Sequence, residues 1–243
     1  MSETPHSKIL VELQDHMGSD EAIANAAWTS SYNLLSRKEI IERGNHDRIA
    51  DLVRRLAREG HAVPFESVVF RFWIRMPIFT DRQHMTHRIA SHNGLSGRYR
   101  TMPDDWYPMP DEVRDIFKRA SPMTEEVAYL EAAFLYNASC VQSYRTYETL
   151  LSSLRAGRGL GKITEAEYKR GREVARGVLP LAGMVERTTV LNLRSFANYQ
   201  RQRNSPHAQP EIRQVAELML QEVEKANVCP VALAALIEAG WRL

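Results

Sequence analysis

A run of alternating apolar residues leads directly into a basic stretch, and this junction constrains the fold more than any other feature. Residues 67–79 place Phe70 and Phe72 on an apolar face and Arg71 on a mixed face. This two-residue alternation predicts a β-strand whose second face is only partly covered. Pro77 is expected to end its regular pairing. The strand therefore anchors the polar stretch that follows it to the hydrophobic core.

The polar stretch, residues 82–100, is rich in arginine, histidine and hydroxyl side chains. Guanidinium groups match pairs of phosphate or carboxylate oxygens, and glycine and serine let backbone N–H groups approach an anion. Composition alone leaves a second interpretation equally open, namely a solvated basic face beside the strand. We predict a helix over about residues 81–92, with the turn that follows it marked by Asn93-Gly94 and Gly97.

The spacing within this stretch favours the anion site. Residues 86–88 read Thr-His-Arg, and after seven further residues the chain reads Ser-Gly-Arg-Tyr at 96–99. This pattern resembles the signature of flavin-dependent thymidylate synthases (the ThyX family), which reads Arg-His-Arg, seven residues, Ser, and then usually Gly-Arg-Tyr. Thr86 stands where the family has its first arginine.

The bulk composition is typical of a soluble globular protein, with 44% hydrophobic and 26% charged residues in a chain of 243. We predict an α+β, helix-dominated single domain over residues 1–243 with one β-sheet early in the chain, as the ThyX resemblance also implies. The formal net charge of +2 argues against a nucleic-acid partner. Cys140 and Cys229 fit neither a metal site nor a disulfide framework, so we expect no metal.

The chain also shows no targeting or membrane signal. Its N-terminus lacks the basic region and apolar core of a signal peptide, and no apolar run reaches membrane-spanning length. We therefore expect a cytoplasmic protein with no membrane partner.

Helical periodicity and capping signals predict the remaining elements. Asp20 is expected to cap the first helix, Gly60 to end the second, and Thr164 and Glu167 to form a capping box. Beyond about residue 112 we expect helices only. The predicted elements are a strand at 8–13, helices at 21–35, 47–59, 124–156, 164–180, 192–203, 211–227 and 231–239, an irregular loop at 101–110 and a turn at 157–162.

Further segments extend the resemblance over nearly the whole chain. Taken singly, each has a structural interpretation as a cap, a surface pair or a loop residue. The matching segments, in the family's order, are Ser30, His61 to Glu66 (His-x-x-Pro-Phe-Glu), Arg176 within Val-Ala-Arg-x-Val-Leu-Pro, Asn192-x-Arg194-Ser, Asn198, Arg203, and His207 within Ser-His-Ala-Gln.

The resemblance implies a homotetramer with FAD and nucleotide bound at subunit interfaces. The reaction would be reductive methylation of uracil at carbon 5 of a uridylate, with methylenetetrahydrofolate as the carbon donor and NADPH as the reductant. Arg203 would be catalytic, lying on the pyrimidine and polarising it. The substrate would be held by Gln83, Ser96, Gly97, Arg98, Arg176 and Arg203. FAD and folate would be contacted by Ser30, His61, Glu66, His87, Arg88, Asn192, Arg194, Asn198 and His207.

Three departures from the family pattern cluster around the nucleotide site. Thr86 and Trp28 replace arginines, and Gly94 stands where the family usually has Glu or Gln. The chain thereby looks like the family's offshoot that methylates UMP in polyoxin-type nucleoside antibiotic biosynthesis. Two alternatives stay open: an ordinary dUMP-specific thymidylate synthase, and a degenerate member that binds nucleotide or FAD without turnover.

Overall fold

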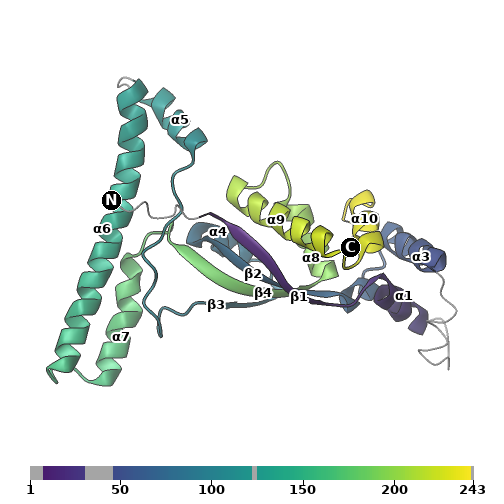
Figure 1. Ribbon diagram of the computed structural model, residues 1–243, viewed down its shortest axis with the longest axis horizontal. Helices are drawn as coiled ribbons and strands as arrows, with labels where there is room; N and C mark the ends of the chain where they lie inside the picture. The colour runs from purple at the N-terminus through teal and green to yellow at the C-terminus, as the bar shows by residue number, and fades with distance from the viewer. Residues whose placement is uncertain (1–7, 31–45, 122–124, 242–243) are drawn as a thin grey trace. The chain divides into compact units, whose positions relative to one another are not determined.

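The structure is a computed structural model that describes residues 8–30, 46–121 and 125–241 (Figure 1). Its contacts divide the chain into two compact units. Unit 1 comprises residues 1–8, 76–81 and 95–185, and unit 2 comprises residues 9–75, 82–94 and 186–243. Each unit is described by itself below.

A four-stranded sheet forms the centre of unit 2. The strands are β1 (Leu10–Met17), β2 (Val69–Pro77), β3 (Ser91–Gly94) and β4 (Met184–Asn192), in the spatial order β1-β2-β4-β3. β1 and β2 are antiparallel, as are β3 and β4, with Ser91 opposite Val190 and Gly94 opposite Arg187. The last residues of β2 and the first of β4 belong to unit 1.

Helices pack around this sheet within unit 2. They are α1 (Asp20–Thr29), α3 (His46–Glu59), the 3-10 helix η1 (Val63–Ser67), α8 (Leu193–Arg203), α9 (Pro210–Ala226) and α10 (Pro230–Glu238). α9 lies against β1, and α10 lies against α3. Phe70 and Phe72 point inward from β2, and their ring centroids lie 5.3 and 6.1 Å from that of Phe196 on α8. The apolar face of β2 therefore fixes α8, whose polar end carries Arg203.

Unit 1 is built on one long helix. It contains α5 (Asp111–Ala120), α6 (Glu125–Gly159), α7 (Glu165–Ala175) and the 3-10 turn η2 (Arg176–Val178), with α5 and α7 packed against α6 (Figure 1). Cys140, Tyr144, Tyr147 and Leu151 are buried along α6, whereas Leu135 is 55% exposed. Among the described helices, none has the length and apolar character needed to cross a bilayer.

The α+β, helix-dominated fold class is confirmed, and most local signals correspond to real element ends. Gly60 ends α3 with a φ of 72°, and Thr164 and Glu167 form the predicted capping box of α7. The first helix is capped by Ser19 rather than Asp20, whose carboxylate instead accepts hydrogen bonds from the first turn of α10. Residues 31–35 of that predicted helix lie outside the described residues.

Two predictions about the sheet region are wrong. The helix expected over residues 81–92 is α4 (Ile78–His84), and residues 91–94 form β3, so Asn93-Gly94 is strand rather than turn. The chain after residue 112 is not purely helical, because β4 occupies residues 184–192 and is an inner strand of the sheet. The sheet thus draws on both halves of the chain rather than on its early part alone.

Candidate functional site

The end of α4 positions the histidine-containing segment in unit 2. The Thr86 hydroxyl donates to the Gln83 carbonyl at 2.7 Å, and the Thr86 backbone N–H donates to the same carbonyl at 3.2 Å. A threonine hydroxyl that donates to a backbone carbonyl three residues earlier competes with continuation of the helix. The chain therefore leaves the helix here and presents Thr86 and His87 side by side.

Arg203, the last residue of α8, contacts both of these side chains. Its Nε donates to His87 Nε2 at 2.9 Å, and its Nη2 donates to Thr86 Oγ1 at 3.0 Å. His87 Nε2 must carry a lone pair to accept this bond, so the ring is neutral. Burial, and then the Arg203 cation and His92, lower the pKa of His87 to about 4. Two predicted site residues from distant segments, His87 and Arg203, are thus brought into direct contact.

A buried polar network lies behind this pair. His84 is 1% exposed; its Nδ1 lies 3.0 Å from the Tyr199 hydroxyl and its Nε2 lies 2.9 Å from Thr189 Oγ1. His92 continues the network, with Nδ1 3.1 Å from Thr189 Oγ1 and Nε2 3.3 Å from the His87 carbonyl. The Tyr199 ring also packs on the His87 ring at a centroid distance of 4.6 Å.

One pattern of hydrogen bonds gives every member of this network a partner without a charged ring. The His87 carbonyl can only accept, so His92 Nε2 donates to it and His92 Nδ1 accepts from the Thr189 hydroxyl. Thr189 then accepts from His84 Nε2, and His84 Nδ1 accepts from the Tyr199 hydroxyl. Burial, and then the neighbouring His92, His87, Arg187 and Arg203, lower the pKa of His84 to about 3, which keeps it neutral. Each polar group of the network therefore has a hydrogen-bond partner, and the network holds the residues that pack against His87 in place.

The sequence patterns did not identify this network. The sequence shows a histidine at position 84, but its hydrogen-bond partners Thr189 and Tyr199 lie on β4 and α8, more than a hundred residues away. The β-branched run in β4, Thr188-Thr189-Val190, was the available signal for a strand at that place.

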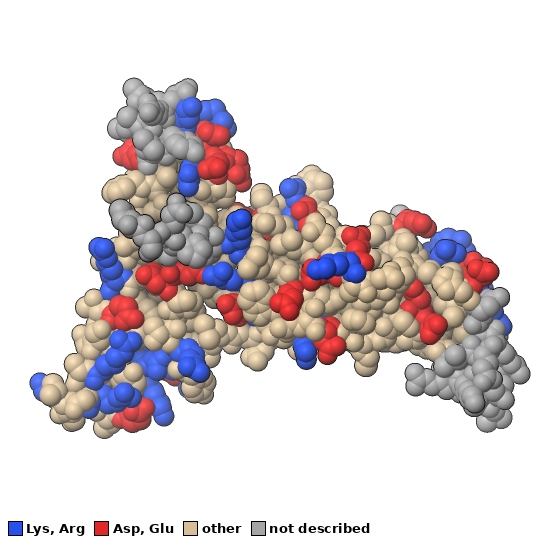
Figure 2. Space-filling model, viewed as in Figure 1, with Lys and Arg blue, Asp and Glu red and all other residues tan. Residues whose placement is uncertain are grey.

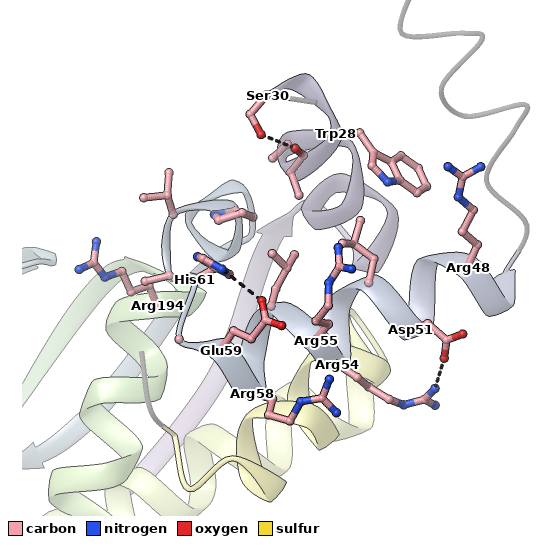
Figure 3. Close-up of a pocket in the computed structure, with 18 residues that line it drawn as sticks. Trp28, Ser30, Arg48, Asp51, Arg54, Arg55, Arg58, Glu59, His61 and Arg194 are labelled. Carbon is pink, nitrogen blue, oxygen red and sulfur yellow. Dashed lines mark hydrogen bonds and ion pairs between the residues drawn. The ribbon is translucent and has the colours of Figure 1, made fainter. Parts of the chain in front are cut away.

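A second part of unit 2 forms an open pocket of ≈ 1230 Å³ between α1, α3, η1 and α8, named here the α1–α3 pocket (Figure 3). It brings together three predicted cofactor residues: Ser30, His61 and Arg194. The fourth, Glu66, lies beside them, because its Oε1 is 2.6 Å from Arg194 Nη1. The arginine, hydroxyl and imidazole groups and the size of this pocket fit a phosphate-bearing dinucleotide.

The remaining predicted residues of unit 2 are dispersed. Gln83 hydrogen-bonds to Gln209, and Asn192 caps α8 by accepting from the Ser195 N–H at 2.8 Å. Asn198 accepts from side chains of its own helix, Arg201 and Gln202. Two further predicted residues, Arg88 and His207, are exposed in the segments that follow α4 and α8.

Unit 1 holds the other predicted substrate residues around a tight turn. The Ser96 carbonyl accepts from the N–H groups of Tyr99 and Arg100, both at 3.1 Å. A Cβ at Gly97 would lie 3.2 Å from Arg176 Cδ, so glycine allows the turn to pack on that side chain. Arg98 and Arg176 then converge on α7 (Glu165–Ala175).

One residue of α7, Glu173, connects these two arginines. Arg98 Nε lies 2.7 Å from the Glu173 carboxylate, and Arg176 Nε donates to the Glu173 carbonyl at 3.1 Å. Glu173 was not among the predicted site residues. The hydrogen bond from Arg170, and then the nearby Arg98 cation, lower the pKa of its carboxyl group, so it is ionised at neutral pH. The turn and α7 together form an arginine pair organised by one carboxylate.

Comparisons with known proteins agree on one family. The family model described as "Thymidylate synthase complementing protein" (Thy1) matches residues 12–231. The flavin-dependent thymidylate synthase of Pseudothermotoga lettingae is 34% identical over 90% of this chain and 86% of its own length. That of Thermus thermophilus is 35% identical over 95% of this chain and 76% of its own length.

A solved structure extends the similarity to three dimensions. The UMP/dUMP methylase PolB from Streptomyces cacaoi, bound with 5-Br dUMP, has a TM-score of 0.77 and 28% identity, with 97% of each chain covered. The same methylase bound with 5-Br UMP has a TM-score of 0.73. The resemblance drawn from residues 86–99 is therefore confirmed, and the chain belongs to the Thy1 family of flavin-dependent thymidylate synthases.

Proposed function

We propose that this protein is a flavin-dependent uridylate C5-methyltransferase that converts UMP to 5-methyl-UMP or dUMP to dTMP. The carbon donor would be methylenetetrahydrofolate and the reductant NADPH. The observation that carries the proposal is the Arg203 guanidinium, held by His87 and Thr86 in a chain of this family. Its relatives are flavin-dependent thymidylate synthases and its structural neighbour is a UMP/dUMP methylase, which supports the same reaction.

The α1–α3 pocket supports FAD as the cofactor. Its donor set of Ser30, His61 and Arg194 suits the phosphates and polar ring atoms of such a group, and Glu66 orients Arg194. His87, Arg88, Asn192, Asn198 and His207 complete the proposed set of flavin and folate contacts. When bound, FAD supplies the two-electron chemistry that side chains cannot provide.

Arg203 is the proposed catalytic residue. Carbon 5 of uracil is a weak nucleophile, and negative charge that develops on a ring carbonyl is stabilised by a fixed cation. His87 and Thr86 hold two of the guanidinium's nitrogen atoms, so its plane is set before substrate arrives. The neutral His87 accepts from this cation without repelling it, and the buried network keeps His87 in place.

The nucleotide phosphate is assigned to the arginine pair of unit 1. Arg98 and Arg176 offer guanidinium groups beside the Ser96–Gly97 turn, whose backbone and hydroxyl add donors. Gln83 is proposed to contact the uridylate as well. In the proposed homotetramer, these groups would come together in one site from different subunits.

We infer that UMP is accepted and preferred over dUMP, and Gly94 is the residue that motivates this. The absence of a side chain at Gly94 leaves room beside the nucleotide for the extra ribose hydroxyl. Arg187 occupies part of that room, since a Cβ at Gly94 would lie 3.1 Å from Arg187 Nη1. Its guanidinium is a donor that the added hydroxyl could use.

We also infer that the whole chain, residues 1–243, acts as one domain in a homotetramer in the cytoplasm. An apolar groove of ≈ 720 Å³ in unit 1 supports association. It includes Phe117, Leu135 and Leu181, which are 48%, 55% and 56% exposed. Exposed apolar patches of this kind are typical of interfaces.

The test is a methylation assay with equal UMP and dUMP, methylenetetrahydrofolate, NADPH and FAD. We expect 5-methyl-UMP to exceed dTMP in the product mixture. Light scattering should show a tetramer, and absorbance spectroscopy should show bound flavin. Predominant dTMP would assign ordinary thymidylate synthase activity. Bound flavin and nucleotide without any methylated product would support the alternative of a binding protein without turnover.

A further inference from the structure

We propose that one face of α3, made of Arg48, Arg55 and Arg58, binds the phosphates of the reductant NADPH. The inference rests on the proposed function, because it assigns a docking position to the co-substrate of that reaction. None of these three residues belongs to the proposed flavin, folate or uridylate contacts. They line the same α1–α3 pocket as Ser30, His61 and Arg194.

Helix periodicity places the three arginines together and away from the core. At 100° per residue they fall within about a quarter turn of one another. The buried residues Ala50, Val53, Leu56 and Ala57 lie on the opposite side of α3. In Figure 3, Arg55 points from α3 toward α1 and across the pocket. The exposed face of this helix therefore carries the three arginines together with the carboxylates of Asp51 and Glu59, which also line the pocket.

Two of the three guanidinium groups have positive charges that no neighbouring carboxylate pairs with in the described part of the chain. There, Arg55 and Arg58 have neither a hydrogen-bond nor an ion-pair partner. Arg48 lies over the Trp28 ring at 5.4 Å, while Arg54, on the neighbouring side of α3, pairs with Asp51 at 3.4 Å. The lining of the pocket contains five arginines against two carboxylates, in a chain whose net charge is only +2. Positive charge is thus concentrated at this pocket.

A basic patch in unit 1 shows that arginines without ion-pair partners are not a general feature of the protein's surface. Figure 2 shows Lys and Arg side chains gathered where α6 ends and α7 begins, with carboxylates among them. There Arg158 pairs with Glu165 at 3.3 Å, and Lys169 pairs with the same carboxylate at 3.9 Å. Those cations pair with a neighbouring carboxylate, whereas Arg55 and Arg58 have no such partner in the described part of the chain.

The spacing of the arginines indicates a long polyanion rather than one phosphate. Arg48 and Arg58 are separated by about 15 Å of helix rise, and Arg55 and Arg58 by about 4.5 Å. A dinucleotide with a diphosphate and a separate 2′-phosphate has anionic groups spread over such a distance. The reductant must also reach the flavin, so a site that shares the flavin pocket is where it can bind. FAD has no phosphate beyond its diphosphate, for which Arg194, oriented by Glu66, is the proposed contact.

The experiment compares the double variant Arg55→Gln/Arg58→Gln with the native protein. Isothermal titration with NADPH, NADH and adenosine 2′,5′-bisphosphate measures the binding directly when the flavin has first been reduced by dithionite, because no hydride is then transferred. We expect Kd for NADPH and for the bisphosphate to rise at least about tenfold, and Kd for NADH to change less. The control is Arg213→Gln, an arginine of α9 that lies outside the α1–α3 pocket and pairs with Glu217. It should leave all three titrations unchanged.

Two further measurements separate this proposal from the proposed function. Flavin binding, followed by absorbance, should be the same in the double variant and the native protein. A single turnover started by dithionite, which bypasses NADPH, should also be the same. Unchanged NADPH binding in the folded variant would overturn the proposal, and equal weakening of FAD and NADPH would reassign the arginines to the flavin. A native protein that binds NADPH but never methylates uridylates would contradict the proposed function alone.

Discussion

The two regions that carry the proposed site hold their arginines in different ways. In unit 2, Arg203 rests on the neutral acceptor His87, which is backed by a buried network of hydroxyl and imidazole groups. In unit 1, Arg98 pairs with the ionised Glu173, and its own side chain is 58% exposed. A neutral buried support fixes a cation without using up its charge. A carboxylate partner compensates that charge until a ligand anion displaces it.

Removing the rigidly held arginine should have the largest effect. We expect Arg203→Ala to lower kcat by about 10²- to 10³-fold, because a preorganised cation at the developing charge contributes about 2.7–4 kcal/mol to lowering the barrier. Melting temperature should change little, since the guanidinium itself makes no core contact. Steady-state methylation kinetics and thermal unfolding measure the two quantities. Near-native turnover in the folded variant would remove Arg203 from the catalytic role.

Breaking the buried support should mainly cost stability. His84→Leu leaves the Tyr199 hydroxyl without its partner and removes one of two partners from Thr189. Each buried polar group without a partner costs about 1–3 kcal/mol in the free energy of unfolding. Urea unfolding checks this value, and His16→Leu, at an exposed position on β1, is the control. A stability loss no larger than that of the control would mean that the network is not a structural support.

The same histidines should make stability depend on pH. The pKa of His84 is about 3 and that of His87 about 4 in the folded state, against 6.5 for a free histidine. Between these pKa values the unfolded chain binds more protons than the folded one. The contribution of the two histidines to stability is therefore fully present above about pH 6.5 and is lost as pH is lowered. Each histidine can contribute a slope of at most about 1.4 kcal/mol per pH unit. Urea midpoints at pH 7.5, 6 and 5 measure it, and His84→Gln should flatten the dependence.

The comparison also explains how much the sequence could predict. Features set by neighbours along the chain were predicted correctly: the alternation of β2, the Gly60 end of α3 and the Thr164–Glu167 capping box. Features set by distant pairing were not. β3 forms because residues 91–94 pair with residues 187–190 of β4, and this pairing overrides the helical pattern seen locally.

The site follows the same division. Family spacing identified His87 and Arg203, and the structure places them in contact. The groups that support or oppose the site arginines, Thr189, Tyr199 and Glu173, are ordinary in their local sequence. Their roles depend on which side chain lies opposite them after folding, and periodicity contains no such information.

The smallest expected effect concerns Arg98, whose partner Glu173 could be replaced by a nucleotide phosphate. Glu173 is ionised and occupies Arg98 Nε at 2.7 Å, so it competes with a nucleotide phosphate for that guanidinium. We expect Glu173→Gln to tighten UMP binding a few-fold at low salt, and the gain to shrink as salt screens the charges. Stability should change little, because exposed ion pairs contribute little to folding. Titration with UMP at two salt concentrations measures the effect. Glu165→Gln, which removes a carboxylate of the same helix that pairs with Arg158, should leave UMP binding unchanged. Weaker binding by Glu173→Gln would mean that Glu173 positions Arg98 for the phosphate rather than competing with it, and the two regions would then hold their arginines for the same purpose.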